Sequence, residues 1–288
     1  MTRLPPDDFR STRAYLPDEA FALVSDKPDP PIDRIDEKDW KGMIALADDV
    51  VLRTTSFQGK LAGHCYDAWA AVVDTFPQKR FEEPPVFEAL LDLSDYLQSS
   101  SFSAMHGFYR QAFATLRSAI EIMVVTTRFS LFDGHAALQS WRHEEDSAAR
   151  IYFTKDLDQL AKNSEVVRLN QAMAPTVFIN GEGRQREGWV WATYQCLSKF
   201  THGIPGYTDG ELWMSNGPVW VDWVFALYIQ MMREVLGISV LLARLGDPEL
   251  DLGSDILQLF SFDGETWIPG FRRALNALGV GFPGTAEA

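Results

Sequence analysis

The stretch FSAMHGFYRQAFATLRSAIEIMVVTTRF, residues 102–129, decides the fold class of this protein. Its apolar side chains recur every three to four residues, and an α-helix collects such residues on one face. The stretch therefore predicts one helix over residues 104–128, about seven turns long. At 100° per residue, the other side of this helix carries a mostly basic polar stripe. The stripe consists of His106, Arg110, Arg117, Glu121 and Arg128.

Most of the remaining chain has the same helical periodicity, whereas strand-like alternation is scarce. Further helices are predicted over residues 36–57, 61–76, 84–98, 135–146, 150–172, 189–202, 219–245, 251–260 and 264–278. The prediction is an all-α protein with a single helical bundle. The two most apolar helices, 104–128 and 219–245, should form its centre, with 189–202 packed across them.

The chain is predicted to have three parts. Residues 1–37 are rich in proline and acidic residues, and proline removes backbone donors, so they form an extended N-terminal arm. Residues 38–280 form the all-α helical domain, and residues 281–288 form a flexible tail.

Composition and charge limit the classes of function. Hydrophobic residues make up 46% of the chain and nine tryptophans are present, which is typical of a globular protein. The formal net charge of −14 repels phosphate backbones and anionic lipids, so nucleic-acid and membrane binding are not expected. Arg233 and Glu234 interrupt the apolar helix 219–245, which indicates a buried core helix and no membrane span.

Cellular location is predicted from two further features. The segment MTRLPPDDFR has no apolar core of the kind found in a secretory signal. The two cysteines, Cys65 and Cys196, form no CxxC motif or metal spacing, and we expect free thiols in a reducing cytoplasm.

The polar stripe on helix 104–128 has two interpretations. It could be a solvated face on which Arg117 and Glu121 form an ordinary exposed pair. Alternatively, because Phe113 and Val124 share the stripe, another helix could cover it. A covered Arg117 needs Glu121 as its partner and would keep spare donors for an anionic ligand.

The segment CLSKFTHG, residues 196–203, is the second candidate for chemistry. Tyr194, Ser198 and His202 are spaced four residues apart and so lie along one side of a helix. His202 and Gly203 could simply end that helix, or the row could form one wall of a polar pocket. Asn216 lies in the loop WMSNGPVW, shortly before a proline at the predicted start of the next helix. It is either a plain turn residue or part of a helix start that binds an anion.

We predict that Arg117, Glu121, Ser198 and His202 converge in one cluster, because buried hydroxyls and imidazoles need polar partners. Tyr194 belongs to the same ligand-binding set, and Asn216 lies at its rim. No cofactor is expected, because phosphate-cradling motifs such as GxxxxGK[ST] and GxGxxG are absent. No metal site is expected either, since HAALQSWRHEED contains no HExxH pattern.

Five segments together resemble a family of bacterial helical proteins related to the HEPN superfamily. They are GFYRQAFATLRSAIEI, Trp141, Phe153, YQCLSKFTHG and SNGPVW, and the resemblance covers roughly residues 100–245. Many HEPN members are ribonuclease toxins or phage-defence components, and the resemblance implies a helical bundle in that context.

The ribonuclease motif of that superfamily is not well matched in this sequence. The motif is an arginine, four to six further residues and then a histidine, with a polar residue directly after the arginine. Its one match runs from Arg128 to His135, but Phe129 replaces the polar residue and Gly134 should break the helix. The resemblance therefore implies a non-catalytic binding or regulatory protein, whose partner is another protein, a second copy of this chain or a small anionic ligand. The alternative is an atypical HEPN-type ribonuclease that acts on RNA through Arg117, Glu121 and His202.

Overall fold

The computed structural model describes residues 45–75, 84–143, 152–180, 187–201, 217–262, 265–266 and 270–281. The chain divides into two compact units, residues 1–48 and residues 49–288. The predicted arm, residues 1–37, lies outside the described residues, and so does the predicted tail beyond Gly281. The description that follows concerns the second unit.

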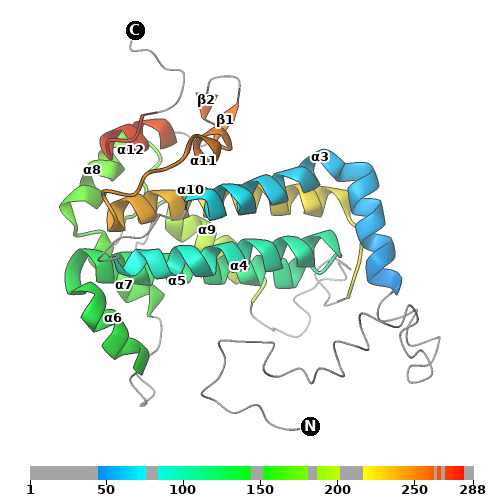
Figure 1. Ribbon diagram of the computed structural model, residues 1–288, viewed down its shortest axis with the longest axis horizontal. Helices are drawn as coiled ribbons and strands as arrows, with labels where there is room; N and C mark the ends of the chain where they lie inside the picture. The colour runs from blue at the N-terminus through cyan, green and yellow to red at the C-terminus, as the bar shows by residue number, and fades with distance from the viewer. Residues whose placement is uncertain are drawn as a thin grey trace. The chain divides into compact units, whose positions relative to one another are not determined.

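Helices account for nearly all the regular structure of the described residues, which confirms the all-α prediction (Figure 1). They are α3 (Leu46–Thr75), α4 (Pro85–Met105), α5 (Tyr109–Arg128), α6 (Gly134–His143), α7 (Phe153–Leu160), α8 (Ser164–Ala172), α9 (Trp189–Ser198), α10 (Asp222–Gly246), α11 (Ser254–Gln258) and α12 (Phe271–Ala277), with a π-helical turn, η5 (Phe129–Asp133), after α5. Two antiparallel strands, β1 (Ser261–Phe262) and β2 (Glu265–Thr266), form a short hairpin before α12.

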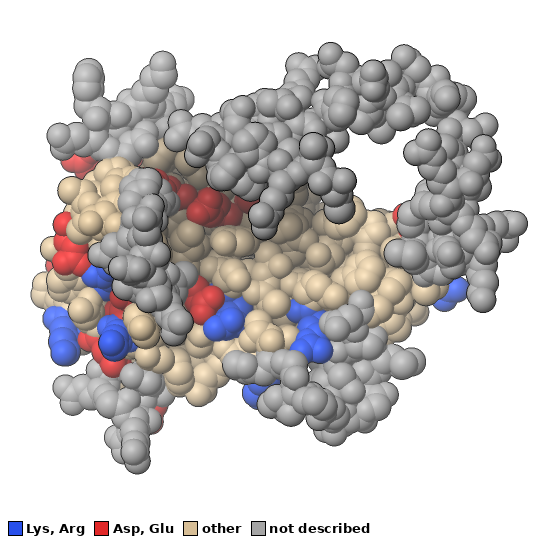
Figure 2. Space-filling model, turned by 90° about the horizontal axis from the view of Figure 1, so that it is seen from below, with Lys and Arg blue, Asp and Glu red and all other residues tan. Residues whose placement is uncertain are grey.

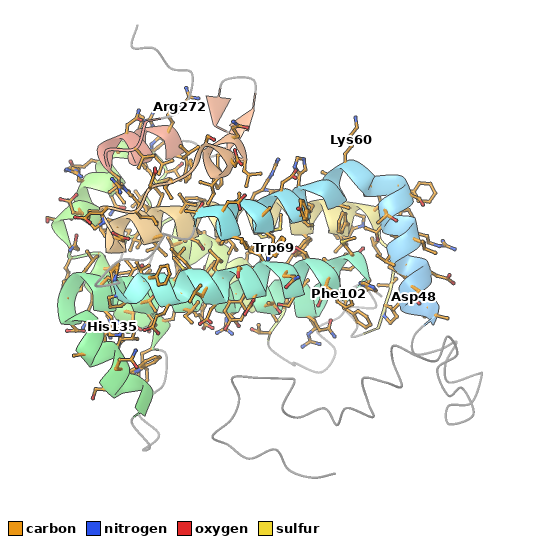
Figure 3. The ribbon with its side chains drawn as sticks, viewed as in Figure 1. Asp48, Lys60, Trp69, Phe102, His135 and Arg272 are labelled. Carbon is orange, nitrogen blue, oxygen red and sulfur yellow. The ribbon has the colours of Figure 1, made fainter. Side chains whose placement is uncertain are left out.

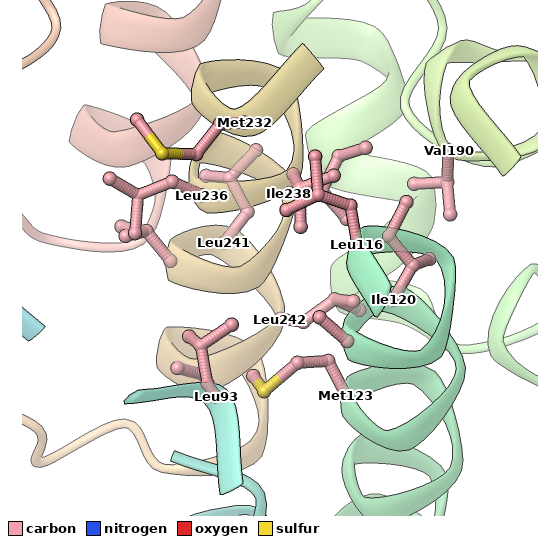
Figure 4. Close-up of a cluster of buried hydrophobic side chains, with 14 of the residues drawn as sticks. Leu93, Leu116, Ile120, Met123, Val190, Met232, Leu236, Ile238, Leu241 and Leu242 are labelled. Atoms are coloured by element: carbon pink, nitrogen blue, oxygen red, sulfur yellow. The ribbon is translucent and has the colours of Figure 1, made fainter. Parts of the chain in front are cut away.

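Helix α5 is the centre of this unit, since none of its residues is exposed. It packs against α4 and α10, and Figure 4 shows the apolar side chains that meet between them. They include Leu93 from α4, Leu116, Ile120 and Met123 from α5, Val190 from α9, and Met232, Leu236 and Leu242 from α10. Burying each such side chain contributes about 1.5–3 kcal/mol. The predicted central pair of helices is confirmed, with α4 as an additional member.

Among the described residues, one helix, α10, is long and apolar enough to cross a membrane. A core helix meets the same criterion, and 72% of the most apolar window of α10 is buried inside the unit. No residue from Met231 to Gly246 is exposed. The interpretation of this segment as a buried core helix is confirmed.

The prediction of one continuous helix over residues 104–128 is wrong at its start. Helix α4 ends at Met105 and α5 begins at Tyr109, so the two form a helical hairpin. Gly107 between them adopts a φ of +81°, and its carbonyl accepts a hydrogen bond from Val219 N–H at 3.4 Å. The Val219 backbone lies so close that it would clash with any side chain at position 107. A contact from a distant part of the chain therefore requires the turn.

Other predicted boundaries also change. The segment 150–172 is two helices, because Asn163 caps α8 through a 2.8 Å bond from Glu165 N–H. The predicted helices 36–57 and 61–76, as far as their residues are described, are continuous in α3, apart from a kink at Gln58. Of the last predicted helix, 264–278, only α12 is helical among the described residues.

Candidate functional site

The polar stripe of α5 is covered by two other helices. Arg110 Nε donates to the Phe200 carbonyl, 2.9 Å away, just after the end of α9. Arg128 Nε lies 2.8 Å from the Asp156 carboxylate on α7. These contacts confirm the covered interpretation, and the solvated interpretation is wrong for these arginines. His106 is not part of this stripe, because it lies in the turn before α5 and its Nδ1 is 2.7 Å from the Phe102 carbonyl oxygen.

Between these two contacts lies a cluster of Arg117, Glu121, Tyr194 and Ser198, called here the Arg117 cluster. Arg117 Nη2 donates to Glu121 Oε1 at 2.7 Å and to the Tyr194 hydroxyl at 2.6 Å. Arg117 Nε donates to Ser198 Oγ at 3.1 Å. The Tyr194 hydroxyl in turn donates to Glu121 Oε1 at 3.0 Å. Four of the predicted cluster residues are thus brought together.

Two helices supply these side chains in a way that follows from their spacing. Arg117 and Glu121 are one turn apart on α5, and Tyr194 and Ser198 are one turn apart on α9. The two rows face each other because α9 packs against α5. Helix α9 ends at Ser198, four residues earlier than predicted. His202 and Asn216, the remaining predicted site residues, lie outside the described residues.

The cluster is partly buried. The side chains of Arg117 and Glu121 are 23% and 17% exposed. Burial raises the pKa of the Tyr194 hydroxyl, against the lowering effect of its hydrogen bond from Arg117. Tyr194 therefore stays protonated at neutral pH and can donate to Glu121.

The ring of Tyr194 is held from the side of α7. Phe153 stacks on it with ring centroids 3.7 Å apart and an interplanar angle of 18°. The guanidinium carbon of Arg117 lies 4.9 Å from the centroid of the same ring. The sequence-based site set did not include Phe153, because its position as the first residue of a helix gives no signal for a contact with α9.

The hydrogen bonding limits what this cluster can do chemically. Ser198 Oγ donates to the Tyr194 carbonyl at 2.8 Å and accepts from Arg117, so no base among the described residues activates it as a nucleophile. Glu121 accepts from a guanidinium and a phenol, which both oppose its use as a general base. Arg117 Nη1, by contrast, has no hydrogen-bond partner among the described residues and is not buried. A group arriving from solvent can accept from this nitrogen.

The match to the ribonuclease motif does not form a site either. Gly134, with φ +77°, separates η5 from α6, where His135 lies (Figure 3). His135 Nε2 lies 3.6 Å from a Glu88 oxygen, whereas Arg128 pairs with Asp133 and Asp156. The motif residues therefore share no partner among the described residues.

The wider surroundings offer little for metal or nucleic acid. The described residues contain no group of three histidine, cysteine, aspartate or glutamate side chains that could hold a metal ion. On the face shown in Figure 2, uncharged or acidic residues separate the described basic side chains. A continuous basic surface, which usually contacts a nucleic-acid backbone, is not visible on the described part of that face.

Comparisons of the chain with protein-family models, curated proteins and solved structures find no match. The relationship to the HEPN superfamily therefore stays a prediction based on the five quoted segments.

Proposed function

We propose that this protein is a non-catalytic helical binding protein of the HEPN-like kind, and that the Arg117 cluster receives an anionic group of its ligand or partner. One observation carries the proposal. Both hydroxyls and the carboxylate of the cluster have hydrogen-bond partners within it, while Arg117 Nη1 remains without a partner among the described residues. A fixed guanidinium with a free nitrogen suits recognition better than acid–base catalysis.

The network also prepares Arg117 for binding. Its Nε and Nη2 are held by Ser198, Tyr194 and Glu121, so the side chain loses little conformational entropy when a ligand arrives. Glu121 compensates most of the charge of Arg117, so the cluster remains stable when it is empty. An anionic group can then be bound and released without disturbing the fold.

The place of such a protein in a cytoplasmic bacterial toxin or phage-defence system forms part of the same proposal. The support for that context is the resemblance to HEPN proteins alone. The acidic net charge separately disfavours RNA as a ligand. The expected partner is another protein or a second copy of this chain, and no membrane is involved.

Two experiments test the proposal. In the first, purified full-length protein is incubated with total RNA, and we expect no cleavage. Cleavage that is abolished by His202→Ala would instead establish the ribonuclease alternative.

The second experiment tests the cluster directly. Sodium acetate is titrated into the protein while the arginine Nε–H signals are followed by nuclear magnetic resonance, with chloride at the same ionic strength as the reference. We expect the Arg117 signal to move with a saturable dependence on acetate. Arg117→Lys should keep the circular dichroism spectrum and lose the binding, because lysine lacks the planar fork. An unmoved Arg117 signal would contradict the proposal.

A further inference from the structure

Arg233 on α10 differs from the other partly buried arginines of the described residues. The others each have a hydrogen bond, an ion pair or another partner: Arg110, Arg117, Arg128, Arg244 and Arg272. Arg233 is half-buried and has neither a hydrogen bond nor an ion pair with any described residue. A half-buried arginine without a counter-charge keeps donors that an anion from solvent can accept from.

The surroundings of Arg233 come from two helices. Helix α3 lies beside α10, since Gln58 of α3 donates a hydrogen bond to Asp222 at the start of α10. His64 of α3 interacts electrostatically with Arg233, and its side chain is 36% exposed. The Asp67 carboxylate lies 3.9 Å from His64 Nδ1 and is itself largely exposed. Arg233 forms no ion pair with a described carboxylate, and burial lowers its pKa.

The site is open to solvent. Ala226 and Gln230 lie on the same face of α10 as Arg233, two turns and one turn before it, respectively, and both are exposed. No guanidinium nitrogen of Arg233 is a buried atom without a partner, so its donors reach the surface. Lys60, one turn before His64, points away from the helices into solvent (Figure 3).

The charge states of the two groups suit an anion. Burial, and secondarily Arg233, lowers the pKa of His64, so the imidazole is neutral at neutral pH. A neutral imidazole can still donate one N–H. Arg233 supplies the positive charge and up to five donors in a planar fork.

We propose that Arg233 and His64 form a binding site for a small oxyanion, a phosphate or a carboxylate, between α3 and α10. This site is independent of the Arg117 cluster, because the two arginines lie on different helices and share no partner among the described residues.

The test is the thermal melting temperature of the full chain at neutral pH with increasing sodium phosphate, and with sodium chloride at matched ionic strength. We expect a saturable rise in phosphate, because an anion that binds the folded state stabilises it. Arg233→Met should weaken phosphate binding about tenfold or more, the loss expected for charge-assisted hydrogen bonds. It should leave the melting temperature without phosphate unchanged or higher, because no partner of Arg233 is stranded.

Three further variants make the result specific. Arg53→Met removes an exposed arginine of α3 and should keep the phosphate response, which accounts for general salt effects. Arg117→Lys removes binding at the Arg117 cluster and should keep the part of the phosphate response that Arg233→Met loses, so that failure of this site and failure of the Arg117 cluster are distinguishable. His64→Gln should weaken the phosphate response less than Arg233→Met does. Arg233→Lys retains the charge and replaces Arg233→Met if the latter does not fold.

Sodium acetate in place of phosphate identifies the source of the oxyanion, and it is measured in the Arg117→Lys variant so that the Arg117 cluster does not contribute to the response. An equal saturable response to acetate assigns the site to carboxylates, and a response to phosphate alone assigns it to phosphates. Either result supports the proposal. An equal phosphate response in wild type and Arg233→Met, or a wild type without a saturable response to either anion, overturns it.

Discussion

Replacing Glu121 with alanine should lower the free energy of unfolding by about 2–3 kcal/mol. The Glu121 carboxylate accepts one charge-assisted hydrogen bond from Arg117, at 2.7 Å, and one from the Tyr194 hydroxyl, at 3.0 Å. A hydrogen bond to a charged group contributes about 1.5–3 kcal/mol to stability, and one between neutral groups contributes about 0.5–1.5 kcal/mol.

Two features keep the expected loss of stability below the sum of the upper limits for the two hydrogen bonds. Arg117 and Glu121 are still 23% and 17% exposed, so water compensates part of the loss, and the effect stays below the about 3–5 kcal/mol of a fully buried pair. Arg117 also keeps its bonds to Ser198 and Tyr194 after the substitution.

The assay is urea unfolding of the full chain followed by far-ultraviolet circular dichroism. Glu121→Gln should lose about half as much as Glu121→Ala, because the amide oxygen still accepts a hydrogen bond. The matched control is Glu165→Ala, which removes an ion pair of similar length on α8, with Arg168 at 2.6 Å. That pair is about half exposed and should contribute about 1 kcal/mol or less. The reasoning is refuted if Glu121→Ala costs no more than Glu165→Ala.

Four other predictions concern individual residues. Gly107→Ala should destabilise the protein by more than about 2 kcal/mol in the same assay, because φ is +81° and the added methyl meets a backbone carbonyl. Gly59→Ala, at a helical site with open space, should instead stabilise it by about 0.5–1 kcal/mol. Burial raises the pKa of the Cys65 thiol to about 11, so an aromatic disulfide reagent at mildly alkaline pH should modify Cys196 first and Cys65 only after unfolding. Burial, more than the opposing arginine, raises the pKa of Asp156, so the folded chain holds this proton more tightly than the unfolded chain. The stability gained from this proton is present below the pKa of Asp156 in the unfolded chain and is lost as pH rises through its pKa in the folded chain. Wild type should therefore gain stability relative to Asp156→Asn as pH falls through the range between these two pKa values.

Much of the fold followed from the order of residues. The large apolar face of residues 104–128 and the almost entirely apolar segment 219–245 predict two central helices, because such apolar surface is stable only when it is buried. The spacing of Arg117 and Glu121 on one helix, and of Tyr194 and Ser198 on another, sets their neighbours within each helix. Their convergence was predictable as well, because buried polar groups must satisfy one another.

The tertiary structure decided the contacts that link distant segments. The break at Gly107 depends on the Val219 backbone, and the stacking of Phe153 on Tyr194 depends on how α7 meets α9. The lack of a partner for Arg233 has the same origin, because nothing in its local sequence distinguishes it from a paired arginine. Helical periodicity fixes which side of a helix a residue occupies. Which residue of another helix meets it depends on how the helices pack, and packing is a property of the whole core.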